Sequence, residues 1–156
     1  MRAVCFAGHR NFVATQEIKD RLYETLEALI ERGAEDFYAG GALGWDMFCE
    51  DAVLDLKKKF PNIKLNIILP CPADEQAAKW NAKQKSQFYM ILKGADRVDV
   101  TSKKFFYSCT KIRNRRLVEL ADCCVCYFEA ENYLGSTGQI LLMAEKANLV
   151  VFNIAK

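Results

Sequence analysis

The sequence has little of several features that mark particular classes of protein. It contains one histidine in 156 residues, and its net charge is only +2, from 22 basic and 20 acidic side chains. So small a net charge does not indicate the strongly basic face by which proteins usually bind duplex nucleic acid. No apolar run approaches the roughly 20 residues that a membrane-spanning helix needs. The apolar start, residues 3–7, is broken at once by residues 8–10, which predicts a first strand rather than a signal peptide. We therefore expect a cytoplasmic protein that binds neither duplex nucleic acid nor membranes.

Cysteine, by contrast, is abundant, with seven residues, and the pattern of these residues argues against both disulfides and a metal site. The number is odd, and most of the thiols lie in apolar runs. Cys123 and Cys126 have CxxC spacing but fall in an apparent strand, where positions three apart point to opposite faces. Zinc would also need further ligands, and there is a single histidine. We expect buried free thiols in a reducing compartment, with no metal and no cofactor.

Strand-like and helix-like segments alternate along the whole chain. Several of the strands are apolar without alternation, which is typical of parallel strands covered on both faces. The expected strands are residues 3–7, 36–39, 64–69, 97–100, 123–128 and 149–153. The expected helices are residues 15–32 (with Thr15 as N-cap and Gly33 as C-cap), 45–59, 74–93, 109–121 and 137–147.

This alternation predicts an α/β fold, with right-handed crossovers joining parallel strands. We expect a single Rossmann-like domain over residues 1–156, a doubly wound, mostly parallel sheet of five to six strands with helices on both faces. The expected strand order is 3-2-1-4-5, with the sixth strand beside the fifth. Ligands of such sheets bind beyond the carboxyl ends of the strands, where the strand order reverses. The turns after the strands are therefore the places to look for function.

The turn after the first strand holds Gly8, His9 and Arg10. A glycine lets the backbone approach a ligand closely, and the two side chains after it can donate to an anion. Alternatively, Gly8 only turns the chain and His9 bonds a neighbouring loop. Because His9 is the only histidine and lies at the expected reversal point, we favour a functional site here.

The turn after the second strand holds Gly40, Gly41 and Gly44 and leads to Asp46 in the next helix. Such a turn can offer backbone N–H groups and a helix N-terminus to a phosphate. It matches neither the GxGxxG fingerprint nor a Walker A loop. Since a carboxylate repels phosphate, Asp46 is expected to face a ribose hydroxyl or to orient His9 or Arg10. A plain first-turn acidic residue, favoured by the helix dipole, is the alternative.

An aromatic and basic loop follows the fourth strand. Phe106 or Tyr107 could stack on a base, and Arg113 and Asn114 lie on the next helix. The alternative is a solvated basic helix start, with the aromatic side chains in the core.

The turn before the last helix contains Gly135, Ser136 and Thr137. Small hydroxyl residues beside glycine at a helix N-terminus make a good anion site, although a plain N-cap explains either hydroxyl alone.

Taken in order, these turns resemble the YpsA-like branch of the SLOG superfamily over nearly the whole chain. The residues that carry the resemblance are Gly8-His9-Arg10, Gly40-Gly41-x-x-Gly44-x-Asp46, Arg113-Asn114 and Gly135-Ser136-Thr137. The resemblance implies a Rossmann-like fold and a role in binding nucleotides or molecules derived from them. Its enzymatic cousins, the Lonely Guy phosphoribohydrolases, cleave the N-glycosidic bond of modified nucleoside monophosphates.

One position departs from those hydrolases. Ile140 stands where their PGGxGTxxE motif has its glutamate. An N-glycosidase needs a carboxylate near the ribose, for which Asp46 and Glu50 are the other candidates.

Three functions follow from these features. The first is the binding or sensing of a nucleotide-derived, phosphate- and ribose-containing small molecule at the carboxyl ends of the strands, with a homo-oligomer possible. The second is an N-glycoside hydrolase of nucleoside monophosphates, with His9 and Asp46 as catalytic residues. The third is a non-catalytic scaffold for a partner or for single-stranded nucleic acid, suggested by residues 103–107. The sequence leaves open whether any reaction is catalysed.

Overall fold

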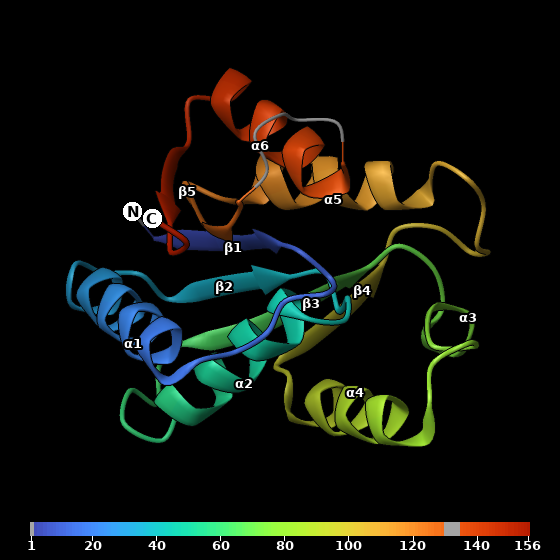
Figure 1. Ribbon diagram of the computed structural model, residues 1–156, viewed down its shortest axis with the longest axis horizontal. Helices are drawn as coiled ribbons and strands as arrows, with labels where there is room; N and C mark the ends of the chain where they lie inside the picture. The colour runs from blue at the N-terminus through green and yellow to red at the C-terminus, as the bar shows by residue number, and fades with distance from the viewer. Residues whose placement is uncertain (1, 130–134) are drawn as a thin grey trace.

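The computed structural model describes residues 2–129 and 135–156, and within them six parallel strands form one sheet (Figure 1). The predicted α/β, Rossmann-like architecture is therefore confirmed. The strands are β1 (Ala3–Gly8), β2 (Asp36–Ala39), β3 (Lys64–Leu69), β4 (Arg97–Val100), β5 (Cys123–Tyr127) and β6 (Val150–Asn153). The helices are α1 (Gln16–Glu31), α2 (Trp45–Leu56), α3 (Ala73–Gln76), α4 (Ala82–Gly94), α5 (Cys109–Leu120) and α6 (Ser136–Lys146).

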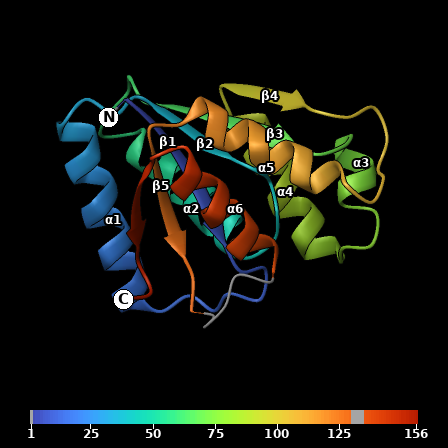
Figure 2. The same cartoon turned by 90° about the horizontal axis from the view of Figure 1, so that it is seen from above.

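The helices form a layer on each face of the sheet. Helices α1, α2 and α4 cover one face, and α5 and α6 lie side by side over the other (Figures 1 and 2). Each face has its own apolar core, with Phe37 and Trp45 in the first and Leu117 and Ile140 in the second. Burial on both faces explains why the central strands are apolar without alternation.

Helix α1 forms as its pattern predicts. Thr15 accepts a hydrogen bond from the amide of Ile18 at its N-terminus, and Leu22 and Leu26 are fully buried on its inner face. The helix ends at Glu31, and Gly33 follows with φ of 107°, the left-handed conformation common after a helix.

The helix expected over residues 74–93 is two helices, α3 and α4. Asn81 interrupts it with a capping box, in which its side chain accepts from the amide of Gln84 at 2.8 Å. In return, the side chain of Gln84 accepts from the amide of Asn81 at 3.0 Å. An Asn-x-x-Gln sequence favours this start of a new helix, and the continuous apolar pattern hid it.

The expected strand order is wrong at one place, because β4 pairs with β3 at the edge and β1 pairs with β5. Strand β4 is polar and mostly exposed, with Arg97 and Asp99 forming an ion pair, so an edge suits it. Asp96 fixes it there, since its carboxylate accepts from the amide of Leu65 in β3 at 2.9 Å. The order therefore reverses between β1 and β5.

The seven cysteines are all buried free thiols, as predicted. Among the described residues, no helix has both the length and the apolar character that crossing a membrane requires.

Candidate functional site

A cleft opens at the carboxyl ends of the strands, at the point where the strand order reverses. The turn after β1 and the N-termini of α2, α5 and α6 converge on it. Its volume is about 210 Å³, and it is lined by Phe6, Ala7, Gly8, His9, Arg10, Asn11, Ala42, Asp46, Thr110, Arg113, Asn114, Leu117, Ser136, Thr137 and Ile140. The structure thus brings eight of the predicted site residues together: Gly8, His9, Arg10, Asp46, Arg113, Asn114, Ser136 and Thr137.

The turn after β1 is held against the start of α2. Gly8 lies so close to Trp45 that there is no room for a side chain, and the amide of Trp45 donates to the carbonyl of His9 at 3.1 Å. Gly44 has φ of 81° and packs against the backbone of Arg10. Glycine is required at Gly44 both by its left-handed conformation and by this close approach. The turn therefore presents His9 and Arg10 from a fixed backbone.

The turn after β2 is held by the protein's own side chains. The amide of Gly41 donates to Oε2 of Glu50 at 3.0 Å, and the amide of Ala42 donates to Oδ2 of Asp46 at 3.3 Å. The carbonyl of Gly40 accepts from Nη1 of Arg113. These groups are thus engaged within the protein, and the three glycines of the turn support the cleft wall without lining it.

Arg113 is the structural centre of the site. It is 3% exposed, and its Nε donates to the side-chain oxygen of Asn114 at 2.9 Å. Its Nη1 reaches the carbonyls of Gly40 and, at 3.4 Å, of Ile68, so one guanidinium ties α5 to the ends of β2 and β3. Burial lowers the pKa of Arg113, and the nearby Asp46 carboxylate acts in the opposite direction.

Two carboxyl groups face this guanidinium from α2. Asp46 is 8% exposed and reaches the cleft, whereas Glu50 is fully buried behind it. Burial raises the pKa of Asp46, with Arg113 opposing the rise. Burial raises the pKa of Glu50 well above its ordinary value, and the charge of Asp46 raises it further. The site therefore holds one guanidinium and two carboxyl groups that are all buried and that shift one another's pKa values.

The N-terminus of α6 closes the opposite side of the cleft. Ser136 and Thr137 line it, and Nδ2 of Asn114 donates to Oγ of Ser136 at 3.4 Å. Gly135 is the N-cap, and within the part of the chain that the structure describes no side chain caps the helix there. The partial positive charge of this end of α6 therefore adds to that of Arg10 and Arg113.

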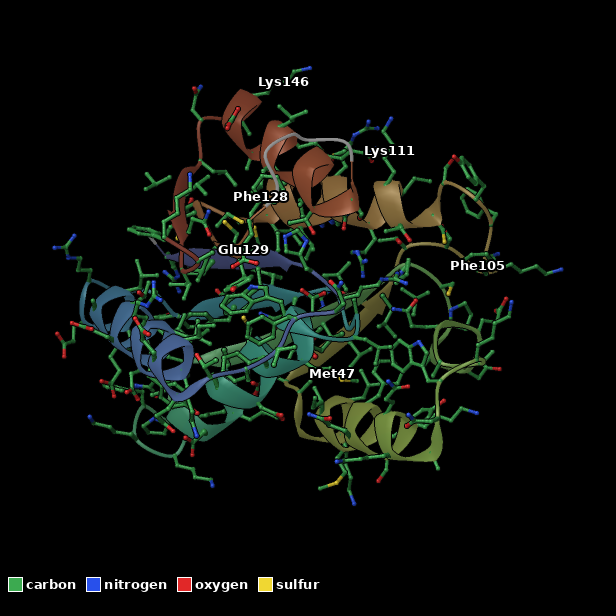
Figure 3. All side chains as sticks on the ribbon, in the orientation of Figure 1. Met47, Phe105, Lys111, Phe128, Glu129 and Lys146 are labelled. Carbon is green, nitrogen blue, oxygen red and sulfur yellow. The ribbon has the colours of Figure 1, made fainter. Side chains whose placement is uncertain are left out.

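His9 lines the cleft, but it also has partners on the rim. Its Nε2 accepts from the amide of Glu129 at 3.3 Å, and its ring stacks on Phe128 with centroids 5.7 Å apart. Phe128 and Glu129 lie near the middle of the view in Figure 3. The bond to a neighbouring loop, which was the alternative interpretation of His9, is thus present in the structure.

Tyr107 is placed away from the cleft. Its side chain is 100% exposed, and its neighbours Phe105 and Phe106 are also exposed. Phe105 projects at the outer edge of the molecule, far across the view from Phe128 (Figure 3). The aromatic loop is therefore neither in the core nor over the cleft.

Two polar residues of the cleft lining, Asn11 and Thr110, were not predicted as site residues, and neither was Ala42. For Thr110 a signal existed, because it precedes Arg113 by three positions and Asn114 by four on one helix and so shares their face. Asn11 and Ala42 line the cleft through the course of their loops, for which the sequence carries no comparable periodicity.

Comparisons with known proteins agree with this description. The family model described as YspA SLOG family matches residues 8–152. A UPF0398 protein of Halalkalibacterium halodurans is 30% identical over 131 residues, which are 83% of this chain and 68% of that protein. A UPF0398 protein of Bacillus pumilus is 31% identical over 143 residues, 85% of this chain and 76% of that protein.

Among solved structures, DNA processing protein A from Helicobacter pylori, studied for its mode of binding single-stranded DNA, is similar with a TM-score of 0.67. The sequence identity is 18%, so this likeness concerns the fold alone. The match covers 97% of this chain, which spans 64% of the length of that one.

Proposed function

The chain belongs to the YspA SLOG family, and from this membership and the geometry of the cleft we propose that it binds a nucleotide or nucleotide-derived molecule at the carboxyl ends of its strands. The ligand contains a phosphate and a ribose. The observation that carries the proposal is the convergence of Arg10, the buried Arg113 and the N-terminus of α6 on one cleft. Helix N-termini and guanidinium groups are the usual partners of phosphate in proteins.

The size of the cleft indicates which part of the ligand is enclosed. Its volume of about 210 Å³ is below the ~300–1,000 Å³ typical of pockets that enclose a whole drug-sized ligand. The sugar phosphate is therefore the part held inside, and the base extends towards the rim, near His9. In this arrangement Ser136 and Thr137 donate hydrogen bonds to the phosphate, and Asp46 faces the sugar.

A thermal-shift screen tests the proposal. The panel is nucleoside mono-, di- and triphosphates, ADP-ribose and NAD, because a ligand that binds only the folded state raises its stability. At 100 times its dissociation constant, such a ligand adds about 2.7 kcal/mol. A second screen uses Ser136→Ala and, as its matched control, Ser102→Ala, which lies outside the cleft lining. Well-folded protein that shows no shift with any compound at millimolar concentration would contradict the proposal.

A second candidate function is the binding of single-stranded nucleic acid on the aromatic loop. Phe105, Phe106 and Tyr107 are 63%, 44% and 100% exposed, and Lys103 and Lys104 precede them. Exposed rings beside cations suit stacking on successive bases. Binding of a fluorescent oligonucleotide that weakens steeply with salt tests this candidate separately from the cleft.

A further inference from the structure

Asp46 and Glu50 form a carboxyl pair at the back of the cleft. They lie one helical turn apart on α2, so both side chains project from the same face of the helix. They accept from consecutive backbone amides, those of Ala42 and Gly41. The charge of Asp46 also raises the pKa of Glu50, so the two carboxyl groups lie close to one another.

Two neighbouring carboxyl groups in a buried site do not both ionise, because two negative charges close together repel each other strongly. The structure distinguishes the two members of the pair. Glu50 is fully buried, and its Oε1 has no hydrogen-bond partner among the described residues. Asp46 reaches the cleft and lies in the field of Arg113. The pKa of Glu50 is raised the more strongly, because of its full burial, so the proton is favoured on Glu50 and the negative charge on Asp46.

The other charged and titratable groups around the pair favour the same distribution. Arg113 on α5 and Arg10 after β1 stabilise a negative charge on Asp46. Asp51, on α2, disfavours a second charge on Glu50. The thiols of Cys49 on α2 and Cys124 on β5 stay neutral, because burial raises the pKa of Cys49, and a hydrogen bond with Cys5 together with burial raises that of Cys124. The cleft thus presents two guanidinium groups and one carboxylate.

An ionised carboxylate accepts hydrogen bonds and donates none. A phosphate is repelled from it and settles towards Arg10 and the N-terminus of α6. Asp46 retains acceptor sites beyond those that the amides of Ala42 and Gly40 occupy, since a carboxylate offers about four. A pair of adjacent sugar hydroxyls supplies the donors that such a group needs.

We propose that Asp46, kept ionised by a protonated Glu50, accepts hydrogen bonds from the adjacent 2′ and 3′ hydroxyls of the ligand, so that the cleft selects ribonucleotides over 2′-deoxyribonucleotides. This inference rests on the proposed function and names the sugar that the cleft requires. In it Asp46 contacts the ligand, and Glu50 is a positioning residue that acts through Asp46.

The test compares the four ribonucleoside 5′-monophosphates with their 2′-deoxy counterparts by isothermal titration calorimetry on the wild-type protein at pH 7. Loss of a hydrogen bond to a charged group weakens binding by about 10- to 100-fold, which is the expected preference for the ribo form. Equal affinity for the two sugars overturns the inference and leaves the proposed function standing. Failure of all eight compounds to bind at 10 mM overturns the inference, whereas the proposed function is overturned only if the wider panel with diphosphates, triphosphates, ADP-ribose and NAD also fails.

Three variants then test the assigned roles, after circular dichroism has established which are folded. Asp46→Asn is expected to reduce the sugar preference to less than threefold. Glu50→Gln, which imitates the protonated acid, is expected to keep it, and to keep it from pH 6 to pH 8. Asp55→Asn, on the same helix but outside the cleft, is the matched control and also keeps it. A sugar preference that survives in Asp46→Asn, or that disappears in folded Glu50→Gln, overturns the inference. The wild-type comparison tests the sugar preference itself without any variant.

Discussion

Gly8 and Trp45 are packed so closely that a Cβ atom on Gly8 would lie 2.5 Å from the Cβ of Trp45, and nearer still to its ring. The ring of Trp45 in turn contacts Phe12 and Tyr127, with centroids 5.1 and 5.5 Å away. This packing fixes the end of β1 against the start of α2. The backbone that presents His9 and Arg10 to the cleft is therefore set by the core beneath it.

Gly8→Ala is accordingly expected to lower the free energy of unfolding by about 2–3 kcal/mol, the cost of overpacking a rigid site. Urea denaturation measures the change. Gly94→Ala is the matched control, because a Cβ there meets Leu54 at an ordinary 3.4 Å. Equal stability of the two variants would show that the contact between Gly8 and Trp45 relaxes freely.

Arg113→Met removes the charge that faces Asp46 and leaves the carbonyl of Gly40 without its donor. Removing one partner of a buried charged group costs about 3–5 kcal/mol. We expect a loss of that size at pH 7 and a smaller loss at pH 5, where Asp46 can take up a proton. Adding Asp46→Asn to this variant restores part of the stability. If the loss of stability in the double variant equals the sum of the losses in the two single variants, the two residues do not interact energetically.

Glu50→Gln should make the protein more stable at high pH. The pKa of Glu50 is raised in the folded state, so neutral Glu50 makes its full contribution to stability at pH values below the ordinary pKa of a glutamate. That contribution is lost as the pH rises through the pKa of Glu50 in the folded protein. The gain therefore increases between pH 5 and pH 8, by about 1.4 kcal/mol for each unit of raised pKa. Thermal unfolding at several pH values measures it. Glu24→Gln, an exposed carboxyl on α1, is the control, and parallel pH profiles for wild type and Glu50→Gln would contradict the prediction.

Asp122→Ala shows the opposite dependence on pH. The Oδ2 of Asp122 accepts from the amides of Arg2 and Ala3, both at 2.9 Å, and these bonds lower its pKa. The stability they provide is present above the ordinary pKa of an aspartate and is lost as pH falls through the lowered value. We expect a loss of about 1 kcal/mol at pH 7 that shrinks towards pH 3. Urea titrations at the two pH values check this, and a constant difference would refute it.

Tyr107→Ala should leave the binding of mononucleotides in the cleft unchanged within twofold, because the side chain is fully exposed. If the aromatic loop binds single strands, the same variant weakens the binding of an oligonucleotide by about 1–3 kcal/mol for each base that no longer stacks. Tyr89→Ala, an exposed tyrosine on α4, is the control. A loss of mononucleotide binding in Tyr107→Ala would mean that the loop reaches the cleft.

The sequence was sufficient for the alternation of strands and helices, apart from the break between α3 and α4, and for eight residues of the cleft. Apolar runs without alternation identify buried parallel strands, and Thr15 identifies the start of α1, because both signals are local. Arg113 and Ser136 could be assigned to one site because the turns of a parallel sheet meet at one edge. These inferences need only the chain itself and a general rule of topology.

Features that depend on distant partners were not predictable in the same way. The position of β4 beside β3 depends on the bond between Asp96 and the amide of Leu65, which no local pattern contains. Likewise, a turn rich in glycine predicts free amides, but Glu50 takes that of Gly41 from a helix that begins four residues later. The exposure of Tyr107 also follows from the path of its loop, which the order of its residues does not specify.

The arrangement of Arg113 between Gly40, Asp46 and Asn114 also restricts the order in which such a site can change during evolution. A lineage that first loses the guanidinium passes through a protein with an unbalanced buried carboxylate, which folds poorly. One that first replaces Asp46 by an amide leaves a cation that a ligand anion in the cleft can still satisfy. We therefore expect descendants of this protein to lose the carboxylate before the arginine, and to keep the glycine turn longest of all.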